Sequence, residues 1–182
     1  MEKTIKTGSS TAADTRVRAT VTTALLAALA CAATMVIRVP SPTGGYMNLG
    51  DTVVLLGAFL LGPWYGALAG GVGSAMADVL SGYMVYAPAT LVIKAVMSIV
   101  AGLLYRGMKE KSGGIVFSAV AGEIPMVVGY WLFDALLLHS FTGSTAGIPS
   151  NLVQAGFGAA VSVFLAVALR KSGYVRSKFS NL

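Results

Sequence analysis

Four charged side chains lie inside long apolar tracts of this sequence, and they are the residues best placed to do chemistry. They are Asp78, Lys94, Glu123 and Asp134. An ionised side chain at the centre of a bilayer costs roughly 2.5–3.5 kcal/mol even on a lenient insertion scale, so such residues face a protein interior or a cavity. We therefore expect them to lie inside a helical bundle, with Lys94 paired to an acid.

The composition places these charges in an integral membrane protein. Of the 182 residues, 55% are hydrophobic and only 11% are charged, whereas a soluble domain carries about 25% charged residues. The mean hydropathy is +0.76. The net charge of +6 does not indicate a nucleic-acid partner. The basic residues fall in short clusters between apolar tracts, and membrane orientation explains them better.

Six apolar tracts predict an all-α membrane protein with six transmembrane helices. The expected spans are residues 17–37, 51–62, 63–81, 88–105, 115–139 and 151–169. They form a membrane domain at 17–170, between a disordered cytoplasmic tail at 1–16 and a basic cytoplasmic tail at 171–182. All but two of the 13 Lys and Arg residues fall on one side of such a bundle, which predicts that both termini are cytoplasmic.

The second span is too short to cross a bilayer by itself. A helix over residues 51–62 is only ~18 Å long, whereas the hydrocarbon core of a membrane is ~30 Å thick. Either the preceding loop at 38–50, which is rich in Pro and Gly, dips inward, or the helix begins inside the protein. Irregular backbone at that depth is tolerated only where protein buries it or where it lines a cavity.

The polar side chains of the spans converge on the outer half of this bundle. Asp78 lies near the outer end of its span, Lys94 lies deeper, and Asn151 and Gln154 open the sixth span on the same side. Glu123 is nearest to mid-depth. We expect a binding site here, covered by two polar loops at the outer surface, residues 38–50 and 140–150.

Several of these residues also have a purely structural interpretation. Lys94 and its acid can form a structural ion pair without any ligand. Asp51, which precedes the apolar run of the second span, suits an N-cap. Asn48 suits a turn.

The aromatic residues and the remaining acid near the outer surface have ordinary explanations as well. Tyr83, Tyr86 and Trp131 are typical of the membrane interface, where aromatic rings gather. Asp134 and His139 come at the outer end of the fifth span, where we expect water to solvate them.

The first span carries a stripe of small residues at intervals of four: Thr20, Ala24, Ala28 and Ala32. Such a stripe lets another helix approach closely. It either packs inside this chain or docks a separate subunit.

The residues do not indicate an enzyme. The single histidine, His139, lies at a span end, and the sequence contains no phosphate-binding loop and no metal-ligand spacing. We therefore expect no catalytic residue, no metal and no cofactor in this chain.

The motifs resemble those of the S components of energy-coupling factor (ECF) vitamin transporters. The resemblance covers about residues 17–170 and is carried by Asn48-Leu49-Gly50-Asp51, Gly62-Pro63-x-x-Gly66 and Asp78-x-x-x-Gly82. Shorter motifs resemble the hydroxymethylpyrimidine or pyridoxine type, which is related to the riboflavin S components. These motifs are Gly122-Glu123, Met126, Gly129-Tyr130 and Pro149-x-Asn151-x-x-Gln154.

The resemblance implies a substrate-binding subunit in a bacterial cell membrane. Its partners are a membrane T component, which meets Ala24, Ala28 and Ala32, and two ATPase subunits, which use the ATP. The substrate is a small water-soluble vitamin, with riboflavin and pantothenate as alternatives to the favoured pair. A membrane scaffold without a ligand is the alternative from another class.

We predict that an apolar pocket binds a flat ring that carries hydroxyl groups. Hydrogen bonds come from polar side chains, and Tyr130 or the aromatic residues of the loops cover the ring face. The full set of predicted binding residues is Asn48, Asp78, Lys94, Glu123, Tyr130, Asn151 and Gln154.

Overall fold

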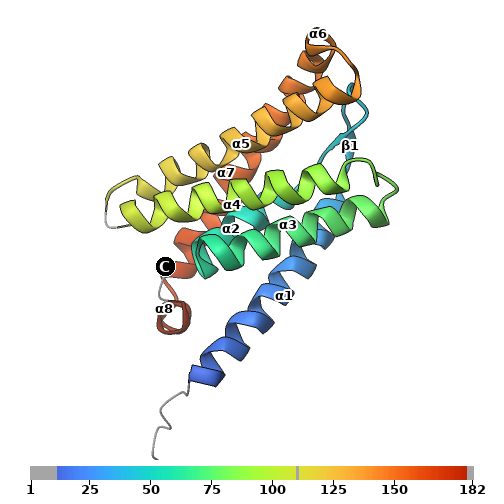
Figure 1. Cartoon of the computed structure of the whole chain (residues 1–182). Helices are drawn as coiled ribbons and strands as arrows, with labels where there is room; N and C mark the ends of the chain where they lie inside the picture. Colours follow the sequence, from blue (N-terminus) through green and yellow to red (C-terminus); the bar gives the residue numbers. More distant parts are fainter. Residues whose placement is uncertain (1–11, 110, 180–182) are drawn as a thin grey trace, which may run out of the picture.

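The chain forms a bundle of α-helices with one short hairpin, shown in Figure 1. The computed structural model describes residues 12–109 and 111–179. In chain order the elements are α1 (Ala12–Val36), β1 (Val39–Pro40), β2 (Tyr46–Met47), α2 (Gly50–Leu61), α3 (Pro63–Leu80), α4 (Ala87–Met108), α5 (Gly114–Leu137), α6 (Phe141–Ser144), the 3-10 helix η1 (Thr145–Gly147), α7 (Ile148–Arg170) and α8 (Gly173–Lys178).

Four helical stretches in the described residues are long and apolar enough to cross a membrane. They are Arg16–Val36, Ala87–Met108, Gly114–Leu137 and Phe141–Arg170. The helices α2 and α3 follow the expected second and third spans closely, but neither belongs to this set, so their crossing stays a prediction. The helix α1 begins at Ala12, inside the predicted tail, and the rest of that tail, residues 1–11, lies outside the described residues.

The short helix α2 is the centre of the bundle. Every residue from Gly50 to Leu60 is buried, and α1, α3, α4 and α7 all pack against it. The sequence allowed either a loop that dips inward or a helix that begins inside the protein. The structure has the second arrangement, because α2 begins inside the protein. Its apolar surface is therefore buried against protein, and 12 residues suffice.

The turn between α2 and α3 depends on a glycine. Gly62 has φ +81°, a backbone conformation that glycine adopts without steric cost. Pro63 then occupies the first turn of α3, where its missing N–H is not needed. The chain reverses here within one residue, so α3 runs back along α2.

The loop at 38–50 is folded rather than irregular. Its strands pair antiparallel, with Val39 opposite Met47 and Pro40 opposite Tyr46. This hairpin lies at the same end of the bundle as α6 and the α3–α4 turn, as Figure 1 shows, while α8 and the α4–α5 turn lie at the other end. The predicted loop at 140–150 also contains regular structure, namely α6 and η1.

The helix α1 is the most peripheral of the long helices. Only 11% of its apolar window is buried, against 33–44% for the other three candidate spans. Its inner face contributes Leu26, Ala30 and Thr34, which are buried. The stripe of Ala24, Ala28 and Ala32 is exposed, so packing inside this chain does not explain it.

Close packing of α2 and α3 predicts a strong effect at Gly66. A Cβ added there would lie 2.8 Å from the Ala58 Cα and 2.9 Å from its backbone nitrogen, so Gly66→Ala must push two helix backbones apart. We expect a loss of about 1–3 kcal/mol of stability, measured as a lower thermal unfolding midpoint of the detergent-purified protein. Gly156→Ala is the control, because a Cβ on Gly156 meets nothing within 4 Å. Equal midpoints for the two variants would contradict this packing.

Candidate functional site

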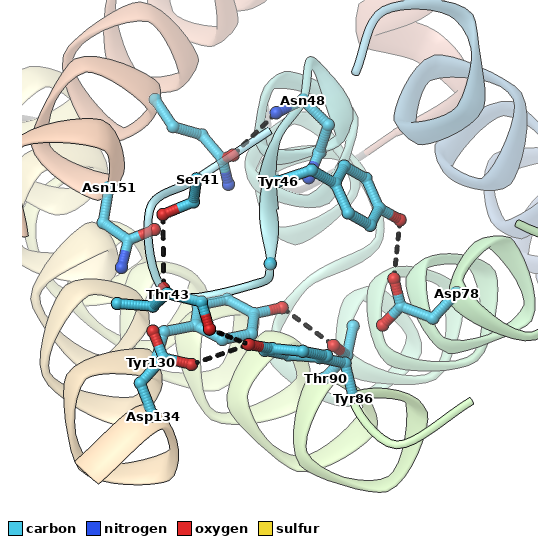
Figure 2. Close-up of a pocket in the computed structure, with 12 residues that line it drawn as sticks. Ser41, Thr43, Tyr46, Asn48, Asp78, Tyr86, Thr90, Tyr130, Asp134 and Asn151 are labelled. Carbon is cyan, nitrogen blue, oxygen red and sulfur yellow. Dashed lines mark hydrogen bonds between the residues drawn. The ribbon is translucent and has the colours of Figure 1, made fainter. Parts of the chain in front are cut away.

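A polar pocket lies beneath the hairpin, where six parts of the chain meet (Figure 2). The hairpin, the loop before α4 and the helices α3, α4, α5 and α7 supply its walls. The lining residues are Ser41, Thr43, Gly45, Tyr46, Asn48, Asp78, Tyr86, Thr90, Tyr130, Asp134, Asn151 and Gln154.

Hydrogen bonds attach the hairpin to the helices below it. The Tyr46 hydroxyl donates to Asp78 Oδ1 at 2.6 Å, which ties β2 to α3. The Tyr86 hydroxyl lies 3.0 Å from Asp134 Oδ1 and 3.3 Å from the Thr43 carbonyl oxygen, so it joins α5 to the hairpin. Figure 2 shows both tyrosines reaching their carboxylates from opposite sides of the pocket.

Both of these tyrosines are protonated donors at neutral pH. Burial raises the pKa of the Tyr46 phenol, and its hydrogen bond to Asp78 raises that pKa further. Burial and the neighbouring Asp134 carboxylate likewise raise the pKa of the Tyr86 phenol. An ionised phenol would face a carboxylate across a hydrogen-bond distance, and the protein disfavours that state.

The pocket is narrow. Its free volume is about 30 Å³, enough for roughly two water molecules, whereas ligand sites for small molecules usually enclose ~300–1,000 Å³. Side chains of the hairpin and of the surrounding helices leave too little space for a ring. Binding of any vitamin-sized molecule therefore requires side chains around the pocket to move.

A buried ion pair lies directly under the pocket. Lys94 pairs with Asp51, and the side chain of each is only 1% exposed. Lys94 Nζ also lies 5.3 Å from the centre of the Tyr130 ring, so this ring separates the ion pair from the pocket. The prediction that Lys94 pairs with an acid is confirmed, and the acid is Asp51.

Asp51 is therefore not the N-cap of α2. Leu49 holds the cap position without a side-chain hydrogen bond, and Asp51 lies in the first turn with 0% exposure. Its side chain points into the protein because Lys94 and Gln154 both bind it. The turn is instead made by Asn48, whose Oδ1 accepts from the Gly50 N–H at 2.8 Å, as predicted.

Gln154 connects the two layers of this site. Its Nε2 donates to Asp51 Oδ2 at 2.7 Å, and its Oε1 accepts from the Asn48 backbone N–H at 2.7 Å. The side chain thus joins the end of the hairpin to the buried ion pair. Movement of the hairpin away from α7 would break or lengthen the hydrogen bond between the Asn48 N–H and Gln154 Oε1.

Glu123 lies away from the pocket lining. It is 3% exposed, and neither carboxylate oxygen has a hydrogen-bond partner within the described part of the chain. It borders an apolar groove of about 350 Å³ between α5 and α7. A Cβ on Gly158 would lie 2.6 Å from Glu123 Oε1 and 2.8 Å from Asp51 Cβ, so the two acids flank the same glycine.

The structure separates the predicted binding residues into two groups. Those that line the pocket are Asn48, Asp78, Tyr130, Asn151 and Gln154. Lys94 lies outside the lining in its ion pair with Asp51, and Glu123 is buried nearby on α5 without a hydrogen-bond partner within the described residues. Their contact with a ligand stays a prediction.

Two expectations for the outer surface are wrong. Asp134 is 3% exposed and Tyr86 is 8% exposed, so the first is not solvated and the second is not a membrane-interface residue. Asp134 follows Tyr130 by one helical turn and shares its face. This spacing indicated that Asp134 lies in the same site as Tyr130. Tyr46 and Tyr86 belong to the loop aromatic residues that were expected near the ligand only as a group, and Thr90 gave no signal in the sequence. His139 is exposed, as expected.

The family of this protein follows from a match over most of the sequence. A family model described as "ECF-type riboflavin transporter, S component" matches residues 14–171. The chain belongs to this family. A protein of Pyrococcus woesei, described as "Uncharacterized protein in gap 3'region", is 40% identical over 139 residues, which cover 76% of this chain and 92% of that protein.

A solved structure has the same fold. It is described as "Structure and mechanism of the S component of a bacterial ECF transporter" and superposes with a TM-score of 0.69 at 19% identity, covering 86% of this chain and 97% of that one. The prediction of an ECF S component is thereby confirmed at the level of family and fold. The chain is a substrate-specific subunit of a membrane transporter, and its family is not an enzyme family.

The buried ion pair of this S component predicts non-additive effects on stability. Lys94→Met leaves Asp51 buried without its cation and should cost about 3–5 kcal/mol. Asp51→Leu should cost a similar amount by leaving Lys94 unpaired. The double variant should lose clearly less than the sum, because no buried charge of the pair remains. Unfolding midpoints of the four purified proteins give the coupling, and additive losses would contradict a stabilising contact.

Proposed function

We propose that this S component captures a small water-soluble vitamin or vitamin precursor outside the cell and delivers it to a T component driven by two ATPase subunits. The observation that carries this proposal is the polar pocket beneath the hairpin. Its lining is rich in hydroxyl, amide and carboxylate groups, and its free volume is small. A few directed polar groups within an apolar bundle suit a small polar ring.

The distribution of basic residues supports an orientation for this pocket. Arg170 at the end of α7 donates a hydrogen bond to Tyr105 near the end of α4, so these two helix ends meet. Arg106 and Lys171 follow at the same end. By the positive-inside rule this end faces the cytoplasm. The hairpin and the pocket then face outward, and all six helices α1 to α5 and α7 belong to the cell-membrane domain.

The favoured substrates are hydroxymethylpyrimidine and pyridoxine, as the short motifs indicate. The small free volume of the pocket supports a single ring, because a smaller ligand displaces less of the hairpin. Riboflavin is the second candidate, because the family model carries its name, and pantothenate is the third. The chain needs no cofactor of its own in this proposal, since the ATPase subunits use the ATP.

The exposed stripe on α1 is the proposed contact with the T component. Ala24, Ala28 and Ala32 face away from the bundle, and the N-terminal part of α1 projects beyond the other helices in Figure 1. Small side chains allow a partner helix to approach closely. This arrangement favours a transporter subunit over a scaffold that works alone.

Ligand binding is the direct test of the proposed function. Small molecules released from the gently purified chain are identified by mass spectrometry, and the chain is then titrated with hydroxymethylpyrimidine, pyridoxine, riboflavin and pantothenate. We expect one compound to bind saturably. Gln154→Leu should weaken its binding about tenfold, because the pocket lining loses an amide group that can form a hydrogen bond with the ligand. Val153→Leu, on the exposed side of α7, is the control, and absence of binding across the panel would favour the scaffold.

Docking on the T component predicts a separate effect at Ala28. Ala28→Leu places a large side chain in the middle of the stripe and should abolish co-purification with the T component while leaving ligand affinity unchanged. Ala160→Leu, the same replacement at an exposed position of α7, should leave the complex intact. A complex that survives Ala28→Leu would show that another face of the chain meets the T component.

A further inference from the structure

The pocket of this S component has an unbalanced charge. Two acids line it, Asp78 from α3 and Asp134 from α5, and each is only 3% exposed. No lysine, arginine or histidine lines it in the described part of the chain. Lys94 lies underneath and is already paired with Asp51, and Arg38, at the base of the hairpin, is exposed. The pocket therefore contains two carboxyl groups and, among the described residues, no basic side chain of its own.

Asp78 also keeps one oxygen free for a ligand. Its Oδ1 accepts from Tyr46, but its Oδ2 is buried and has no hydrogen-bond partner within the described residues. The nearby Thr90 hydroxyl shares a hydrogen bond of 2.9 Å with Tyr130 and also interacts with the Asp78 carboxyl group. Figure 2 shows the second Asp78 oxygen on the side of Thr90 and Tyr86, toward the pocket interior. A buried carboxylate oxygen that is incompletely hydrogen-bonded is costly, so this position can accept a donor from the ligand.

Aromatic rings complete the surroundings of the two acids. Tyr46, Tyr86 and Tyr130 line the pocket, and Tyr83 supports Tyr46 with its ring centre 4.5 Å away. The face of an aromatic ring attracts a cation, most strongly where water is excluded. Tyrosine rings with carboxylates between them are thus a suitable environment for an organic cation.

We propose that the substrate is a small organic cation, namely a ring compound whose protonated amine or ring nitrogen lies between Asp78 and Asp134. This inference rests on the proposed function, because it takes the pocket as the substrate site. It narrows the substrate class from polar rings in general to those that carry a positive charge. A neutral ring would leave the pocket charge uncompensated when the hairpin closes and excludes water.

An inorganic cation fits this site less well than an organic one. Within residues 12–109 and 111–179, no three His, Cys, Asp or Glu side chains gather closely enough to hold a metal ion. A hard cation such as Ca²⁺ needs six to eight oxygen ligands, whereas much of this lining is aromatic. The rings favour a ligand with a flat apolar part beside its charge.

Matched pairs of ligands test the charge directly. Pyridoxamine differs from pyridoxine by an aminomethyl group in place of a hydroxymethyl group, and aminomethylpyrimidine differs from hydroxymethylpyrimidine in the same way. The full purified chain is titrated with all four at neutral pH, where the aliphatic amines are protonated. In at least one pair, we expect the amine to bind about tenfold or more tightly than its alcohol.

Two isosteric variants assign the preference to the acids. Asp78→Asn and Asp134→Asn should each weaken binding of the amine about tenfold while changing binding of the alcohol less than about threefold. His139→Asn, at an exposed position at the end of α5, should change neither affinity. If one acid variant does not fold, the other variant still tests the role of the acids. The ratio of amine affinity to alcohol affinity in the unmodified chain still tests the preference for a cation.

The outcomes separate this inference from the proposed function. The cation inference is overturned if an alcohol, riboflavin or pantothenate binds saturably with an affinity equal to or higher than that of every amine. The S-component function is left intact by that result. Binding of Ca²⁺ alone overturns the inference as well. No saturable binding by any compound, together with no T-component complex, overturns both proposals.

Discussion

The ion pair between Asp51 and Lys94 is the contact on which the rest of this S component depends. Both charges lie at the centre of the bundle, where an unpaired ion would be costly and where the pair itself needs further hydrogen bonds. Gln154 supplies one of them. Three helices are thereby held in one register, because Asp51 belongs to α2, Lys94 to α4 and Gln154 to α7. The buried position of α2 makes this possible, since a helix at the surface could not place its first turn there.

The site is built as two layers that share one side chain. The upper layer is the hairpin with Tyr46 and the loop before α4 with Tyr86, and these two tyrosines contact the acids of α3 and α5. The lower layer is the charge cluster, with Glu123 beside it on α5. Gln154 belongs to both layers, so the position of the hairpin and the geometry of the ion pair are coupled through a single amide group. The pocket therefore lies between the buried ion pair and a hairpin that hydrogen bonds attach to the helices.

The sequence predicted the helices better than it predicted the cover of the site. Long apolar tracts bounded by glycine, proline and basic residues gave five of the main helices to within a few residues. For the short second tract the sequence left two alternatives, and the structure has the helix that begins inside the protein. The hairpin was missed because its two-residue strands have no periodicity to detect. Asp134 was misjudged for a related reason. It lies near the end of a helix, where water is the usual partner of a carboxylate, but Tyr86 reaches it and η1 packs nearby, with Gly147 against the Asp134 side chain. Such burial depends on loops whose course a single sequence does not reveal.

The small free volume of the pocket has a consequence for affinity. The side chains that narrow the pocket compete with any ligand for the same space. The observed dissociation constant is then the intrinsic constant divided by the fraction of molecules whose pocket is wide enough for the ligand. The contacts of Tyr46 and Tyr86 thus oppose binding of any molecule that must displace them. A molecule that binds too weakly to displace these side chains leaves the pocket narrow.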